Sequence, residues 1–91
     1  MLSDKELVKA FKAIANEKRF LILKHLFSTK ELNVGELSEL IKLSFKSTSR
    51  HLVVLANVEL VDVRQVNLNR FYSINSENLK YFNHFFKKSF K

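Results

Sequence analysis

The scarcity of turn-forming residues constrains this chain most: among 91 residues, glycine occurs once and proline is absent. An all-β sandwich or barrel needs many tight turns, which glycine and proline form most readily. Phosphate-binding loops of the P-loop type need several glycines and are excluded for the same reason. The chain is therefore expected to be mainly helical, and its length suits one domain covering residues 1–91.

A strong positive charge indicates the class of partner. Sixteen Lys and Arg residues against nine Asp and Glu residues give a net charge of +7. Residues 44–91 carry eight basic and three acidic side chains, so most of the excess lies in the second half. Such a basic domain attracts a polyanion such as nucleic acid, although the same charge can serve solubility alone.

Several classes of chemistry and location are disfavoured by what the sequence lacks. There is no cysteine, which excludes disulfides, thiolate metal sites and thiol catalysis. No apolar run approaches the roughly 18 residues of a membrane span, and Met1–Ser3 leads directly into charged sequence. We therefore expect a cytoplasmic protein with no membrane partner.

Apolar spacing and capping residues predict four helices in residues 4–57. Ser3 and Glu6 form the pattern of a capping box before a helix over about 4–15, and Asn16 is a suitable cap for a central second helix. A very short strand at 32–34 precedes a short third helix. Ser44 is expected to cap a fourth helix over 45–57, two or three residues after the third, which is helix-turn-helix spacing.

The pattern then changes to a hairpin and a final helix. Residues 60–64 and 70–74 nearly alternate between apolar and polar and predict two antiparallel strands. No glycine is available at the tip, so Asn67 or Asn69 is expected to adopt the left-handed conformation there. A last helix is predicted over about 77–89, capped by Asn75 or Ser76. The fold class is thus mainly α with a β-hairpin wing, a winged helix-turn-helix.

The first and last helices carry more aromatic surface than a small core readily absorbs. One interpretation is that these side chains pack onto the chain's own core. The interpretation we favour is a homodimer interface formed by both helices. Its expected residues are Leu7, Phe11, Leu79, Phe82, Phe85, Phe86 and Phe90.

Several segments resemble repressors of the ArsR/SmtB type. These are residues 11–23, which contain Ala-Ile-Ala-Asn-Glu-Lys-Arg, then 34–38, Leu43-Ser44, and 49–55, which begin Ser-Arg-His-Leu; residues 61–74 match the family's wing in length. The resemblance implies a homodimeric, non-enzymatic repressor that binds an inverted repeat in double-stranded DNA. It also implies that an effector can lower DNA affinity, although the sequence does not identify one.

The positions that bind metals in this family are not matched. Asn33 and Gly35 stand where many members have a cysteine pair, so soft-metal sensing there is not expected. In the last helix, Glu77 and His84 offer two ligands, too few for a four-coordinate site unless a partner adds more. We therefore predict no metal and no cofactor, and no catalytic constellation is recognisable.

Two further departures concern conformation and packing. Glu59 stands where the family often has glycine before the wing, at a cost of about 1 kcal/mol if that position is left-handed. Phe45 stands where a polar residue is frequent, and either contacts thymine methyl groups or packs beneath the helix, the interpretation we prefer. For His51, packing or hydrogen bonding is the default, and a DNA contact is the alternative.

If the domain binds DNA, the amino-terminal part of the fourth helix reads the major groove and the hairpin contacts the minor groove or its phosphates. Arg50 is the leading base-reading candidate. The competing interpretation is a winged-helix module that binds another protein, which an apolar Val53 on the fourth helix would suit. The expected DNA-binding residues are Ser44, Lys46, Ser47, Ser49, Arg50, His51, Arg64, Gln65, Asn67, Asn69 and Arg70.

Overall fold

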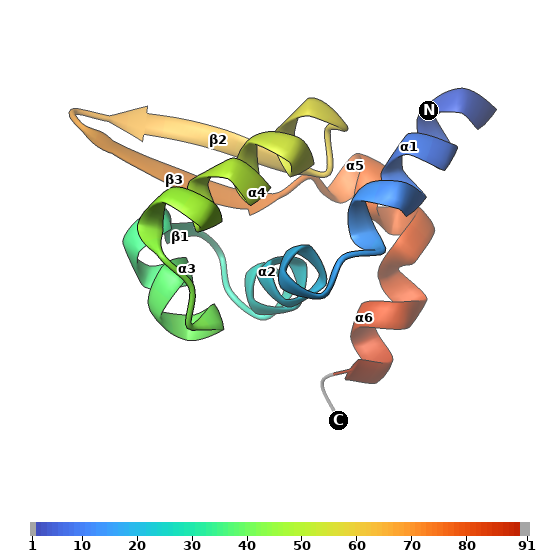
Figure 1. Ribbon diagram of the computed structural model, residues 1–91. Helices are drawn as coiled ribbons and strands as arrows, with labels where there is room; N and C mark the ends of the chain where they lie inside the picture. Colours follow the sequence, from blue (N-terminus) through green and yellow to red (C-terminus); the bar gives the residue numbers. More distant parts are fainter. Residues whose placement is uncertain (1, 90–91) are drawn as a thin grey trace.

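The computed structural model describes residues 2–89 and has the element order of a winged helix-turn-helix (Figure 1). The elements are α1 (Asp4–Ile14), α2 (Glu17–Phe27), β1 (Leu32–Asn33), α3 (Val34–Ile41), α4 (Phe45–Asn57), β2 (Val61–Val66), β3 (Asn69–Ile74), α5 (Ser76–Leu79), the 3-10 turn η1 (Lys80–Phe82) and α6 (Asn83–Ser89). This order confirms the predicted fold class. In this described part of the chain, no helix is long and apolar enough to cross a membrane.

The helix starts are fixed by local hydrogen bonds, as the sequence predicts. Ser3 and Glu6 form both bonds of the capping box at the start of α1. The side chains of Asn16 and Ser44 each accept a bond from a backbone amide three residues later, at the starts of α2 and α4. Asn33 makes a second capping box at α3. Each such cap contributes about 1 kcal/mol to helix stability.

Helix α2 passes through the centre of the core. Its residues Ile22, Leu23 and Leu26 are at most 1% exposed. The predicted inner face of α4 is confirmed, because Thr48, Leu52 and Leu55 are completely buried. The Thr48 hydroxyl donates to the carbonyl of Ser44 at 2.8 Å, so this buried polar group is satisfied. Helix α4 is thus held rigidly on its inner side.

The hairpin is longer and tighter than predicted. Strands β2 and β3 pair antiparallel from Val61–Ile74 out to Val66–Asn69, which leaves a two-residue turn at Asn67 and Leu68. Asn67 takes the left-handed conformation with φ of 56°, whereas Asn69 belongs to β3. The short strand β1 pairs with β3 to make a three-stranded sheet in the order β1-β3-β2. The hairpin projects beyond the helices as a wing (Figure 1).

The final helical segment differs from the continuous helix predicted over 77–89. Asn75 caps it, but a 3-10 turn at Lys80–Phe82 separates α5 from α6. Side chains three apart lie on the same side of a 3-10 turn, which lets Leu79 and Phe82 both enter the core. Both are at most 1% exposed, and Phe86 is completely buried as well.

The predicted strain before the wing is present. Glu59 has φ of 59°, the left-handed conformation that glycine adopts without a steric cost. Its carbonyl accepts a hydrogen bond from the Asn78 side chain at 2.9 Å, which ties this loop to α5. The non-glycine residue costs about 1 kcal/mol at this position.

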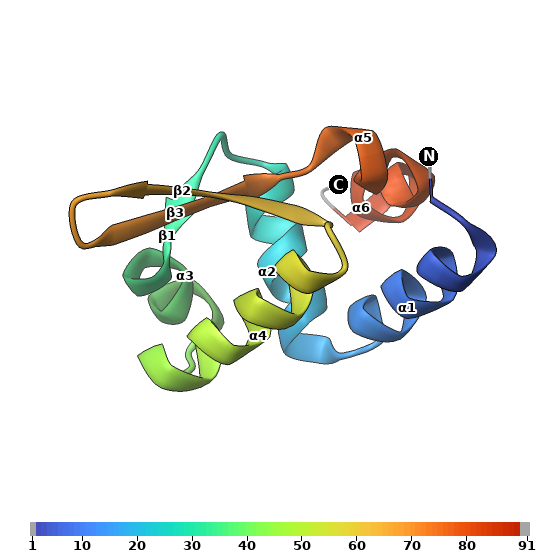
Figure 2. The ribbon, with the colours of Figure 1, turned by 90° about the horizontal axis from the view of Figure 1, so that it is seen from above.

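The elements separate two ends of the molecule. Figures 1 and 2 show the wing, α3 and the start of α4 at one end, and α1, α5 and α6 at the other. The charged candidate DNA surface and the aromatic candidate dimer surface therefore do not compete for the same face.

Candidate nucleic-acid interface

Helix α4 is positioned by Arg19, which bridges three helices. The Arg19 Nε group donates to the Ala13 carbonyl at the end of α1, over 2.6 Å. Its Nη1 group lies 3.2 Å from Nδ1 of His51 on α4. Since a guanidinium only donates, His51 accepts through Nδ1 and carries its proton on Nε2 when neutral. This contact supports the packing and hydrogen-bonding interpretation of His51.

The amino-terminal part of α4 presents polar and basic side chains to solvent. Lys46 and Arg50 lie on the exposed side of the helix, opposite the buried Thr48. Ser44 is exposed at the cap, and its Oγ accepts from the Ser47 amide, which leaves the hydroxyl hydrogen free to donate elsewhere. The structure thus keeps the predicted base-reading side chains accessible. Ser47 and Ser49 are half-buried beside them.

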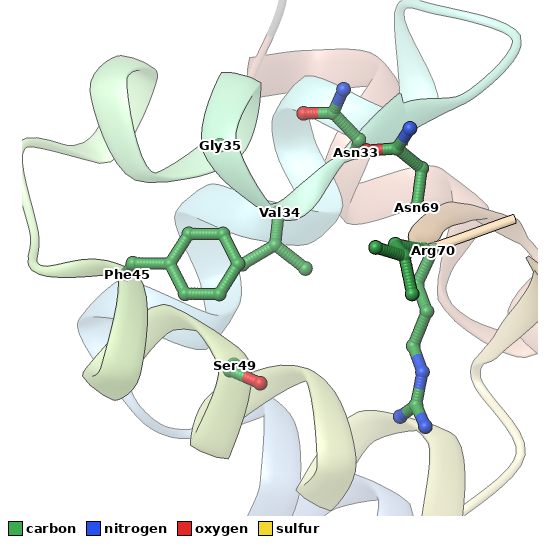
Figure 3. A pocket seen from close by; sticks show the side chains of 8 residues that line it. Asn33, Val34, Gly35, Phe45, Ser49, Asn69 and Arg70 are labelled. Carbon is green, nitrogen blue, oxygen red and sulfur yellow. The ribbon is translucent and has the colours of Figure 1, made fainter.

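A groove of about 420 Å³ joins α4 to the wing (Figure 3). It is bounded by the start of α3, the first turn of α4, and the wing tip. The guanidinium of Arg70 lies on the wing side, and the Phe45 ring is turned toward Val34 on the opposite side. The two predicted DNA-contacting elements therefore border one continuous surface. Its lining residues are Asn33, Val34, Gly35, Phe45, Ser49, Leu68, Asn69 and Arg70.

Phe45 does not pack beneath the helix as we preferred from the sequence. Its side chain is 62% exposed at the first position of α4. Its ring lines the groove and is turned toward Val34 instead of entering the core. Leu68 at the wing tip, which the sequence analysis did not select, is 97% exposed. Its position between two asparagines was the signal that could have identified it.

The wing residues are exposed, but Arg64 already has partners. Its guanidinium donates to the Glu31 carboxylate and stacks over the Phe71 ring, 5.1 Å from the centroid. The hydrogen bond from Arg64, the largest cause, lowers the pKa of Glu31. Arg64 thus ties the wing to the segment before β1, and Glu31 neutralises part of its charge. Gln65, Asn67, Asn69 and Arg70 are also exposed on the wing.

The surroundings of His51 shift its pKa. Burial, followed by the positive charges of Arg19 and Lys18, lowers the pKa of His51 below 6.5. The neutral imidazole is therefore the form that fits between the helices. A protonated ring would lose its acceptor at Nδ1 and would face the Arg19 guanidinium as a like charge.

We expect the protein to become less stable as the pH falls through about 6.5. The unfolded chain binds a proton at His51 there, whereas the folded chain binds it only at lower pH, so the free energy of unfolding decreases. Urea denaturation between about pH 5 and 7.5 measures this, above the range where carboxylates titrate. His51→Gln should flatten the dependence. Equal slopes in the parent protein and in His51→Gln would contradict the assignment.

The described residues contain no group of three or more His, Asp or Glu side chains placed to hold a metal ion. Glu77 instead lies 3.3 Å from the ammonium group of Lys80. His84 is exposed near the Phe85 ring.

The aromatic residues of the predicted dimer interface fall into two groups. Leu79, Phe82 and Phe86 are at most 1% exposed, and Phe82 and Phe86 form part of the wall of the apolar groove. This corrects the expectation for these three, because they pack mainly in the chain's own core. Phe11 and Phe85 are 53% and 56% exposed.

These two phenylalanines border an apolar groove of about 340 Å³, which also contains Phe20. Leu7 is half-buried beside the core. Phe90 lies outside the described residues.

The helix-turn-helix packs on the core through the inner face of its second helix, and the outer face of that helix is basic and exposed beside a wing. This arrangement defines a DNA-binding domain of the winged helix-turn-helix class. The model of the bacterial regulatory proteins of the arsR family matches residues 16–63, and the chain belongs to this family. It is a transcriptional regulator whose DNA-binding domain is the winged helix-turn-helix described above.

Individual relatives agree with this membership. The chain is 41% identical over 73 residues to the transcriptional activator HlyU of Vibrio cholerae, covering 80% of this chain and 67% of HlyU. A solved structure of HlyU from Vibrio cholerae N16961 has a TM-score of 0.82 at 36% identity, covering 92% of this chain and 90% of the other. A homodimeric winged helix-turn-helix domain from Mycobacterium bovis, at 22% identity, shares the fold with a TM-score of 0.81, covering 97% and 86%.

Proposed function

We propose that the chain is a homodimeric repressor that binds an inverted repeat in double-stranded DNA. The observation that carries the proposal is that the first turn of α4 and Arg70 of the wing border one groove, with Lys46 and Arg50 exposed on the same helix, in a chain of net charge +7. A convex helix with basic side chains fits the major groove, and an adjacent hairpin reaches the neighbouring minor groove.

The exposed residues of α4 are assigned different tasks. Arg50 is the base reader, because its guanidinium can donate two parallel bonds to a guanine. Lys46 and the hydroxyl of Ser44 contact phosphates and fix the helix in the groove. Ser47 and Ser49 complete the polar edge of this turn. His51 acts through Arg19 and keeps α4 in position.

On the wing, the amide side chains and Arg70 contact the minor groove or its phosphates. The amides of Gln65, Asn67 and Asn69 can donate to phosphate or to the acceptors of A·T pairs. Arg70 supplies the charge, since Arg64 is paired with Glu31 in the free protein. These contacts orient the domain and add to the salt dependence of binding.

The dimer is proposed to form through the apolar groove between α1 and α6. Phe11 and Phe85 expose more than half of their side chains there. A two-fold axis through this groove lets the same residues of two copies face each other. The interface lies at the end of the molecule away from the wing, so both DNA surfaces stay free (Figure 2). The Mycobacterium bovis domain of the same fold is described as homodimeric.

Selection of bound duplexes from a randomised DNA pool at near-physiological salt tests the proposal. The expected result is an enriched inverted repeat whose half-sites lie about one helical turn apart. Weak binding that salt abolishes, with no enriched sequence, would contradict it. That result would favour the alternative, a protein-binding module, which the 46% exposed Val53 on α4 would suit.

The sign of regulation needs a separate experiment. A bound dimer represses when its site overlaps a promoter, because it excludes the polymerase without further contacts. The relative HlyU is named an activator. A reporter gene placed behind the enriched repeat should be expressed less when the protein is supplied, and increased expression would reverse the proposed sign.

Arg50→Ala is expected to weaken binding to the selected duplex by about 1–3 kcal/mol while leaving the fold intact. Arg50 is exposed, so truncation removes a DNA contact and little packing. A fluorescence anisotropy titration measures the affinity. Arg50→Lys separates two roles: it restores binding if the side chain holds a phosphate, but not if it holds a guanine bidentately.

The matched control for Arg50→Ala is Lys5→Ala, which removes one positive charge from an exposed position on α1. We expect this variant to bind nearly as well as the parent protein. Equal losses for the two variants would show that only net charge matters and would remove Arg50 from the site.

A further inference from the structure

An apolar ring is exposed at the start of α4, where the neighbouring outward side chains are polar or basic. Phe45 is the first residue of α4 and is 62% exposed. The neighbouring outward residues of this helix are Lys46 and Arg50. Exposing a phenylalanine leaves a hydrophobic free energy of burial unused in the free protein. A large apolar side chain that stays exposed in this way suits a surface covered by a partner.

The surroundings of Phe45 indicate what covers it. Its ring lies across the mouth of the groove toward Val34, with Arg70 on the wing side (Figure 3). The exposed charged side chains nearest in sequence on α4 and along this wing edge are cationic: Lys46, Arg50 and Arg70. On the α3 side, the exposed Glu36 is hydrogen-bonded to Asn33 of the groove lining. The α4 and wing sides suit a partner that is anionic and that also presents a small apolar group.

Double-stranded DNA meets both conditions. Its phosphates satisfy the cations, and the C5 methyl of thymine is the apolar group that base edges present in the major groove. We propose that Phe45 is a specificity-determining residue that packs on a thymine methyl group in each half-site. This inference rests on the proposed function, because it requires the start of α4 to enter the major groove.

The position of Phe45 distinguishes its role from that of Arg50. Phe45 and Ser49 line the groove toward the wing, whereas Arg50 does not line it. Arg50 and Phe45 therefore face different base pairs of one half-site. The expected half-site combines a guanine for Arg50 with a thymine at a different base pair for Phe45, and these two base preferences are separable by mutation.

Replacing thymine by uracil tests the proposal, since uracil lacks only the C5 methyl group. In the duplex enriched by selection, each thymine of one half-site is replaced in turn, and the affinity is measured by fluorescence anisotropy. At one position the parent protein should lose about fourfold in affinity, the value for one buried methyl group. Phe45→Ala should bind the thymine duplex more weakly and no longer distinguish thymine from uracil at that position.

Two protein variants control the measurement. Phe45→Leu keeps an apolar contact and should retain part of the discrimination. Leu40→Ala truncates a side chain of α3 that is 48% exposed and does not line the groove, and it should discriminate like the parent protein.

The outcomes separate this inference from the proposed function. If the parent protein binds every uracil duplex as well as the thymine duplex, or if Phe45→Ala keeps the discrimination, Phe45 does not read thymine, although specific DNA binding stands. If selection enriches no duplex, the proposed function fails and this inference fails with it.

Discussion

Phe82→Ala is expected to lower the free energy of unfolding by about 3–5 kcal/mol, the range for truncating a buried phenylalanine. Phe82 is 1% exposed, and Phe11 of α1 meets its ring edge-to-face at 4.9 Å between centroids. The variant leaves a cavity between α1 and the final helical segment and removes this aromatic contact. The free energy of unfolding of a small domain is only about 5–15 kcal/mol in total. Much of the variant protein should therefore be unfolded near 37 °C.

Urea denaturation followed by circular dichroism measures this loss. The matched control is Phe85→Ala, which truncates the same residue type in α6 at a position that is 56% exposed. We expect the control to change the free energy of unfolding by less than about 1 kcal/mol at protein concentrations where the chain is monomeric. Similar losses for Phe82 and Phe85 would contradict the division of the phenylalanines into core and surface.

The sequence was sufficient for elements whose determinants are local. Ser3, Asn16 and Ser44 cap α1, α2 and α4 as predicted, because a cap depends on one side chain and an amide three residues away. The inner face of α4 followed from helical periodicity alone. The left-handed conformation at Asn67 was one of two alternatives predicted from the lack of glycine at the hairpin tip. The left-handed conformation at Glu59 was indicated only by the resemblance to the family, which often has glycine there.

The sequence was insufficient where packing chooses between residues of the same type. Helical spacing places Leu79, Phe82 and Phe86 on one face but does not indicate whether that face packs on the chain's own core or against a partner. The structure places all three in the core, in a segment interrupted by a 3-10 turn that was not predicted. No residue in the turn itself, such as proline or glycine, marked the break.

The candidate site shows the same division between local and distant determinants. Exposure of Lys46 and Arg50 follows from the helix face that they share. The pairing of Arg64 with Glu31 joins residues 33 apart in the chain and depends on β1 lying beside β3. The link from Arg19 to His51 spans 32 residues and depends on the packing of α2 against α4. Spacing along the chain does not indicate either contact.

Phe85→Asp is expected to abolish the dimer and to lower the affinity for the inverted repeat by about 10²–10⁴-fold. Phe85 borders the apolar groove of α1 and α6, and a carboxylate there would face its own copy across the two-fold axis. A dimer binds its second half-site intramolecularly, and this advantage is what the monomer loses. Because Phe85 is exposed, the variant should remain folded, and sedimentation together with DNA titration should show a folded monomer that binds weakly.

Leu40→Asp controls for adding a carboxylate to an exposed apolar position, since Leu40 is 48% exposed on α3 and does not line the aromatic groove. This variant should remain a dimer. A Phe85→Asp protein that still sediments as a dimer would place the interface elsewhere. One that is monomeric but binds the repeat as tightly as the parent would show that pairing is not needed for recognition. The proposed mechanism requires both losses together, because the two α4 helices reach both half-sites only when the groove joins the two chains.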